Sequence, residues 1–186
     1  MRRARVATVV GLLLVLSLVG VALVGAGVLP LPVSPPAEDD YNRTTVTISD
    51  ENGTELGSVE ARVADTFQKR YTGLSNTSSL PEDEGMLFVH EEPQNLTYVM
   101  RGMDFGIDIV FVSANGTITE IHHAPKPPEG ADGEEFRYSG RGQYVLEVNY
   151  EWTTRHGVEV GDRVSAERAG LDASNRSAVS GNTTAC

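Results

Sequence analysis

Apolar and polar residues alternate with a period of two through the central part of the chain, a pattern that predicts β-strands. Many short strands separated by turn signals, with little helix, are typical of an all-β fold. We expect either a β-sandwich or a partly closed barrel. The predicted strands lie at 45–49, 59–63, 86–89, 96–100, 107–112, 117–121, 144–149 and 158–164.

Turn and capping residues support the prediction of a mainly β fold. Asn52-Gly53 and Asn115-Gly116 are dipeptides that favour tight hairpins. Two short helices are expected, at 66–71 and 150–156, because a glycine that can cap the C-terminus follows each of them within two residues.

The N-terminal part of the chain is an uninterrupted apolar segment. Residues 6–29 carry no charge, and at about 1.5 Å per residue they would form about 36 Å of helix, enough to cross a membrane. Arg2, Arg3 and Arg5 precede this segment, so the positive-inside rule places the N-terminus in the cytoplasm and the rest outside. We expect a single-pass anchor in the cell membrane, and a signal peptide cleaved after Ala26 is the alternative.

Composition divides the remainder of the chain. Prolines stiffen the segment that follows the apolar run, and the last residues lack apolar periodicity, which is typical of disorder. The predicted parts are a cytoplasmic N-terminus at 1–5, a transmembrane helix at 6–29, a linker at 30–43, an extracytoplasmic β domain at 44–164 and a disordered tail at 165–186.

The charge balance limits the possible partners. Acidic residues outnumber basic ones by 26 to 15, a net charge of −11, which argues against a nucleic-acid partner because phosphates require a basic face. Only two of the basic residues are lysines, and an acid-rich, lysine-poor composition suits strong salt, so we expect a halophilic source. The single cysteine, Cys186, excludes an internal disulfide and a multi-thiolate zinc site.

The asparagines favour an outward-facing domain independently. Seven of the eight begin an Asn-X-Ser/Thr sequon, and only Asn149 does not. Some of this excess can arise from turn-forming Asn-Gly dipeptides, but not all of it. We therefore expect a glycoprotein with these candidate sites: Asn42, Asn52, Asn76, Asn95, Asn115, Asn175 and Asn182.

Four sequence blocks occur in a characteristic order: VADTFQKRYTGL at 63–74, LPEDEGMLFV at 80–89, IDIVFV at 107–112, and YVLEVN followed by W, HG and VGDRV across 144–164. Together they resemble the family called domain of unknown function 192, in the form of a membrane-anchored, haloarchaeal-type member. The resemblance implies a compact, mainly β domain, often behind a signal or membrane segment, and brings no established activity with it.

Asp108 interrupts the most apolar predicted strand, between Ile107 and Ile109. An unpaired carboxylate in apolar surroundings costs several kcal/mol, so Asp108 must be hydrogen-bonded or paired. Arg101 is the nearest cation in the sequence and the expected partner. Such a pair would either pin two strands together or form the floor of a ligand site.

A second group of polar residues lies near the end of the domain. Glu147 and Asn149 share the polar face of a predicted strand and are close in sequence to Trp152 and His156. These four side chains either line a small pocket for a polar ligand such as a sugar, or belong to an ordinary half-exposed strand face. The histidine and carboxylate spacings match no metal clamp, so we expect no metal and no cofactor.

No nucleophile motif or catalytic constellation is present in the sequence. We therefore expect a non-catalytic binding or interaction module of the cell envelope, whose partner is a small polar ligand or an envelope protein. The alternative is a small extracellular hydrolase or sugar-processing enzyme that uses Asp108 and Glu147 as its two carboxylates, which would have to share one cleft.

Overall fold

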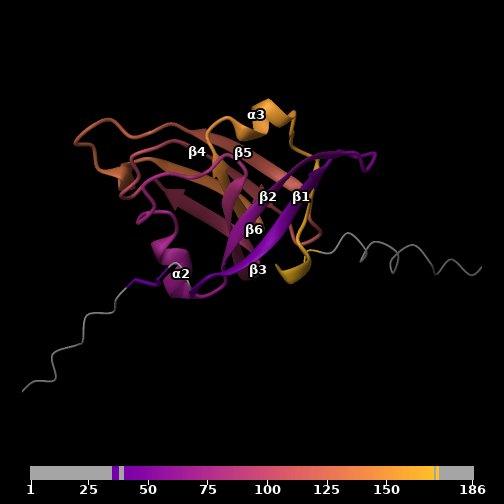
Figure 1. The fold of residues 1–186 in the computed structure, drawn as a ribbon, viewed down its shortest axis with the longest axis horizontal. Coiled ribbons are helices and arrows are strands. Elements are labelled where there is room, and N and C mark those ends of the chain that lie inside the picture. Colours follow the sequence, from indigo (N-terminus) through magenta and orange to yellow (C-terminus); the bar gives the residue numbers. More distant parts are fainter. Residues whose placement is uncertain (1–34, 38–39, 170, 172–186) are drawn as a thin grey trace, which may run out of the picture. The chain divides into compact units, whose positions relative to one another are not determined.

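The computed structural model describes residues 35–37, 40–169 and 171 of the 186-residue chain. Strands dominate this region, and the helices are short (Figure 1). In chain order the elements are β1 Asn42–Ser49, β2 Glu55–Ala64, α2 Phe67–Thr72, β3 Glu84–Val99, β4 Ile107–Val112, β5 Ile118–Ala124, the 3-10 turn η2 Gly133–Glu135, β6 Arg137–Asn149, α3 Trp152–His156, β7 Arg163–Ser165 and the 3-10 turn η3 Glu167–Ala169.

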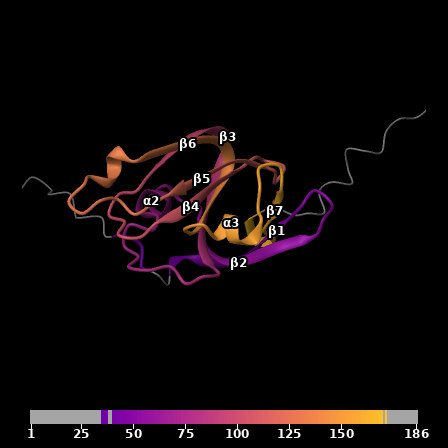
Figure 2. The ribbon, with the colours of Figure 1, turned by 90° about the horizontal axis from the view of Figure 1, so that it is seen from above.

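All seven strands belong to one sheet, in the order β5-β4-β6-β3-β2-β1-β7. Neighbouring strands run antiparallel except β2 and β3, which are parallel. The sheet curls into a half-barrel (Figures 1 and 2). The expected mainly β fold with two short helices is thus confirmed, and the partly closed barrel, rather than the two-sheet sandwich, is the architecture observed.

Backbone hydrogen bonds join the two ends of this strand order. Thr117, just before β5, forms an isolated bridge with Arg163 of β7. Around this bridge the amide of Ile118 donates to Asp162 O at 2.9 Å, and the amide of Val164 donates to Gly116 O at 2.8 Å. The contact satisfies edge groups that would otherwise be left to solvent, and it draws the sheet into its curved form.

Two apolar layers cover the two faces of the sheet. Val110 and Val112 of β4 contribute to one layer together with Trp152, whereas Ile109 and Phe111 contribute to the other. All six residues of β4 are buried, which explains why this strand is apolar on both of its faces. Burial of each large apolar side chain contributes about 1.5–3 kcal/mol, so the central strands carry most of the stabilisation.

Several strands begin earlier than expected, and β6 begins at Arg137 rather than at 144. Three other differences concern whole elements or the domain boundary. The strands expected at 86–89 and 96–100 are two parts of the single strand β3, whose pairing with β6 is interrupted by a bulge between Val89 and Gln94. The strand expected at 158–164 shrinks to β7, because a turn with Gly161 at φ 106° precedes it. The ordered region also extends beyond the expected boundary at Val164, since Leu171 is buried and pairs with Ala166.

No helix in the described part of the chain is long and apolar enough to cross a membrane. Several predicted features lie outside the described residues: the transmembrane helix at 6–29, the alternative cleavage site after Ala26, the sequons at Asn175 and Asn182, and Cys186.

Candidate functional site

The structure divides the six predicted site residues between the two faces of the sheet. In the pairing of β4 with β6, Ile109 lies opposite Glu147 and Asp108 lies opposite Val148. Because side chains alternate along a strand, Asp108 and Glu147 project to opposite faces. The two carboxylates therefore do not meet in one cleft.

Asp108 is fully buried and receives hydrogen bonds from three residues. The amide of Glu151 donates to Oδ1 at 2.9 Å, and Thr153 donates to Oδ2 through its amide at 2.9 Å and its hydroxyl at 2.6 Å. Nδ1 of His123, on β5, lies 2.7 Å from Oδ1. Asp108 was thus correctly expected to be buried and paired, but its partners are His123 and the start of α3.

Arg101 lies elsewhere, and the expected Arg101–Asp108 pair is not formed. The guanidinium of Arg101 pairs with Glu134 at 3.3 Å and donates to the carbonyl of Tyr71. It also lies over the Tyr71 ring, 4.1 Å from the centroid. The nearest cation in the sequence is therefore not the nearest partner in space.

Trp152, His156 and Asn149 stabilise the fold rather than line a common pocket. Trp152 is fully buried and stacks on His156, with ring centroids 3.9 Å apart. The amide of Asn149 donates to the carbonyls of Leu80 and Pro81, at 2.6 and 2.8 Å. These contacts hold neighbouring segments of the fold together.

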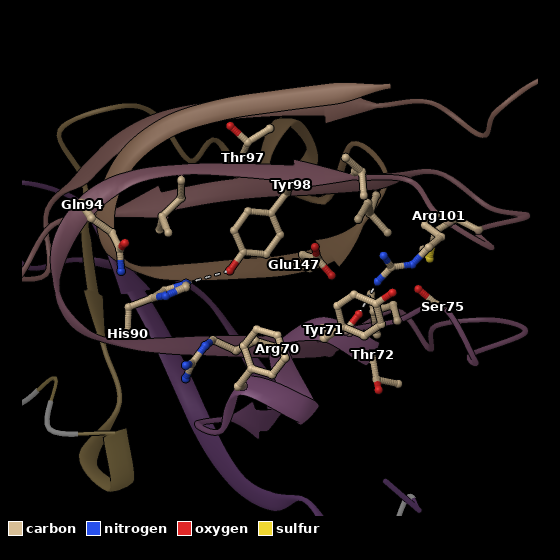
Figure 3. Close-up of a pocket in the computed structure, with 17 residues that line it drawn as sticks. Arg70, Tyr71, Thr72, Ser75, His90, Gln94, Thr97, Tyr98, Arg101 and Glu147 are labelled. Carbon is tan, nitrogen blue, oxygen red and sulfur yellow. Dashed lines mark hydrogen bonds between the residues drawn. The ribbon is translucent and has the colours of Figure 1, made fainter. Parts of the chain in front are cut away.

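A pocket of about 460 Å³ opens on the face of the sheet to which Glu147 projects (Figure 3). Helix α2 and the chain after it form one wall, and the second half of β3 forms another. Of the predicted site residues, Arg101 and Glu147 line it. The other polar lining residues are Arg70, Tyr71, Thr72, Ser75, His90, Gln94, Thr97 and Tyr98.

Glu147 is the one carboxyl group among the residues that line this pocket. Its side chain is directed into the pocket between Tyr98 and Arg101 (Figure 3), yet the residue is only 5% exposed. Burial raises the pKa of Glu147 to about 8, and the positive charge of Arg62 opposes part of this rise. At neutral pH this carboxyl group is therefore largely protonated and uncharged.

His90 and Tyr98 form a hydrogen-bonded pair on the β3 wall. Nε2 of His90 lies 3.1 Å from the Tyr98 hydroxyl, as the dashed line in Figure 3 marks. Burial lowers the pKa of His90, and the charge of Arg70 lowers it further. Burial also raises the pKa of Tyr98 well above its usual value, with a further rise from Glu147. Both side chains are therefore neutral near pH 7.

Arg70 and two aromatic rings complete the wall formed by α2. One guanidinium nitrogen of Arg70, Nη1, donates to the carbonyls of Asp65 and Val89, both at 2.9 Å. Phe67 and Tyr71 stack on each other, are largely exposed and lie at the rim of the pocket. Apolar surface at the mouth of a polar pocket is typical of a ligand site.

Glu147 and Arg101 were predicted as site residues from the sequence, whereas Arg70, His90 and Tyr98 were not. Arg70 was predicted only as part of a short helix, and the segment around His90 lacked the alternation that would mark a strand. Parallel pairing of β2 with β3 brings the α2 connection alongside β3. In the described part of the chain, no group of three or more His, Cys, Asp or Glu residues is arranged to hold a metal ion.

The sequence profile of DUF192, a family described as an uncharacterized ACR, matches residues 47–166, and the chain belongs to this family. The fold is similar to that of a "putative transcription regulator" from Sinorhizobium meliloti 1021, with a TM-score of 0.61, 26% identity, and coverage of 68% of this chain and 95% of that one. It is also similar to a protein of unknown function from Novosphingobium aromaticivorans DSM 12444, with a TM-score of 0.61, 23% identity, and coverage of 75% and 99%. No curated protein matches the sequence.

The Asp108 network predicts a large and specific loss of stability. Asp108→Asn should lower the free energy of unfolding by about 3 kcal/mol, because an amide nitrogen would face buried donors. Arg101→Met is the matched control and should cost less than about 1 kcal/mol, since its ion pair is partly exposed. Urea denaturation of the full chain measures both, and equal losses would contradict this assignment.

Glu147 predicts a pH-dependent stability difference. The pKa of Glu147 is raised from 4.5 to about 8 in the folded state. Its contribution to the free energy of unfolding is therefore complete below about pH 4.5 and is lost as the pH rises through about 8. Glu147→Gln should therefore gain stability relative to wild type between pH 5 and pH 9, by about 4 kcal/mol. Urea denaturation at both pH values tests this, with the exposed Glu92→Gln as control. A difference that does not grow with pH would refute the raised pKa.

Proposed function

We propose that this protein is a non-catalytic binding module of the cell envelope, which holds a small polar ligand in the pocket above Glu147. The observation that carries the proposal is the Glu147 carboxyl group itself. It is buried, it faces the pocket, and no described residue hydrogen-bonds to it. Its oxygens are not among the fully enclosed polar atoms of the described residues that lack a partner, so they open onto the pocket, where a ligand can take the place of water as their hydrogen-bonding partner.

The geometry favours binding over hydrolysis. A glycosidase-type mechanism needs two carboxyl groups that flank the scissile bond, within about 5–10 Å of each other. Glu147 is the sole carboxyl group among the pocket-lining residues, and Asp108 projects to the other face of the sheet. The alternative that pairs these two residues in a hydrolase therefore receives no support.

An extracytoplasmic position is supported by the asparagines. The five described sequon asparagines, Asn42, Asn52, Asn76, Asn95 and Asn115, are all exposed. Asn149, which begins no sequon, is half-buried and uses its amide to hold the Leu80–Pro81 segment. The distribution is the one expected if surface asparagines serve as glycan acceptors.

The apolar segment 6–29 would anchor the protein, and the acid-rich composition fits a halophilic, haloarchaeal-type member of the family. The charge of this chain disfavours the DNA-binding role that the name of the Sinorhizobium meliloti protein suggests for that protein. A net charge of −11 opposes contact with a phosphate backbone.

Ligand binding is tested by thermal-shift titration of the full chain against neutral monosaccharides and small organic acids and amides. At least one compound should raise the melting temperature. Gln94→Trp, which fills the pocket from its β3 wall, should abolish the shift, whereas Glu92→Trp, on the same strand but outside the lining, should retain it. A panel with no binder would refute the module, and a chemically altered ligand after incubation would favour an enzyme.

The envelope position is tested on protein from its native cells. Its mass should exceed the value calculated from the sequence, and Asn52→Gln and Asn115→Gln should each remove one increment, while Asn149→Gln should not. A tag before Arg2 should survive protease added to intact cells, while the domain should be cleaved. An unmodified mass together with a protected domain would place the protein elsewhere.

A further inference from the structure

The charges around the pocket are unusual for so acidic a chain. The charged and titratable groups that face Glu147 are Arg62 on β2, Arg70 and Tyr71 on α2, His90 and Tyr98 on β3, and Arg101 after β3. Arg101 is already paired with Glu134. The positive charge of Arg70 is thus the one in the pocket lining that no described carboxylate balances.

The guanidinium of Arg70 is fixed in place but only partly used. Its two hydrogen bonds run from Nη1 to neutral carbonyls, those of Asp65 and Val89. These bonds hold the planar group in one orientation and leave the Nε–Nη2 edge without a partner among the described residues. That edge presents two parallel N–H donors, which match the two oxygens of a carboxylate.

The rest of the lining suits the body of a small organic molecule. Leu74, Leu96 and Ile107 are buried and line the pocket, and the Phe67 and Tyr71 rings flank its mouth. The volume of about 460 Å³ lies within the range of small-molecule sites. A bare inorganic anion would leave this apolar surface uncovered.

We infer that the ligand of this pocket is a small organic acid, whose carboxylate binds the Nε–Nη2 edge of Arg70 and whose apolar body lies against Leu74, Leu96 and Ile107. The inference rests on the proposed binding function and names its ligand class. The protonated Glu147 carboxyl group can donate a hydrogen bond to the ligand, and once ionised it repels a carboxylate. Affinity for an acid should therefore fall as the pH rises through about 8.

The test uses the full chain and matched pairs of probes at one ionic strength: butyrate, hexanoate, benzoate and phenylacetate, each beside its primary amide. Calorimetric titration at pH 6 should show at least one acid binding about tenfold or more tightly than its amide. Arg70→Met should remove this preference, and Lys69→Met, the neighbouring cation on α2 that does not line the pocket, should keep it.

Two further measurements keep the inference falsifiable if Arg70→Met does not fold. Arg70→Lys retains the positive charge but lacks the edge with two parallel donors. It should therefore weaken the binding of the acid but not that of the amide. The loss of acid affinity between pH 6 and pH 9 should disappear in Glu147→Gln. Amides or sugars that bind as tightly as acids would overturn the organic-acid inference and leave the binding module standing. Absence of any bound compound would overturn both.

Discussion

The buried carboxylate of Asp108 is the interaction on which the arrangement of the domain depends. It lies on β4, contacts His123 on β5, and accepts hydrogen bonds from the amides of Glu151 and Thr153 and from the Thr153 hydroxyl, at the start of α3. Glu151, in that same turn, is the one non-glycine residue with a positive φ in the described chain, at 60°. A strained turn of this kind persists only where the surroundings over-determine it. From this point α3 leads towards β7, which meets the start of β5 and joins the ends of the sheet.

Glu147, one strand away, is buried without such partners. Asp108 has four donors on a face filled by Trp152 and the barrel core, whereas Glu147 faces a hollow under α2 and the far half of β3. A buried carboxylate whose hydrogen bonds are satisfied rigidifies its surroundings, whereas a carboxyl group that opens onto a pocket remains accessible. The same side-chain chemistry therefore holds structure together on one face and lines an open pocket on the other.

Local patterns in the sequence were sufficient for the fold class, both hairpin turns and both short helices, because each depends on residues that are near one another. The continuity of β3 was missed because Glu91, Glu92 and Pro93 break its alternation at the bulge. The partner of Asp108 was wrong because backbone amides in a left-handed turn have no sequence signature. Only two of the pocket residues were predicted. In the sequence, Glu147 has the pattern of a half-exposed strand face, but the residue is buried, and α2, which is far away in the sequence, lines the same pocket.

The separation of the two carboxylates also bears on how such a domain diverges. Ser75, Gln94 and Thr97 line the pocket, and none of them is a hydrogen-bond partner of Asp108. Substitutions there would change the shape and polarity of the wall without removing a hydrogen bond to Asp108. Under the proposed binding function, a change of ligand would therefore need no prior gain in stability. That gain is needed where the residues that recognise the ligand also hold the core together.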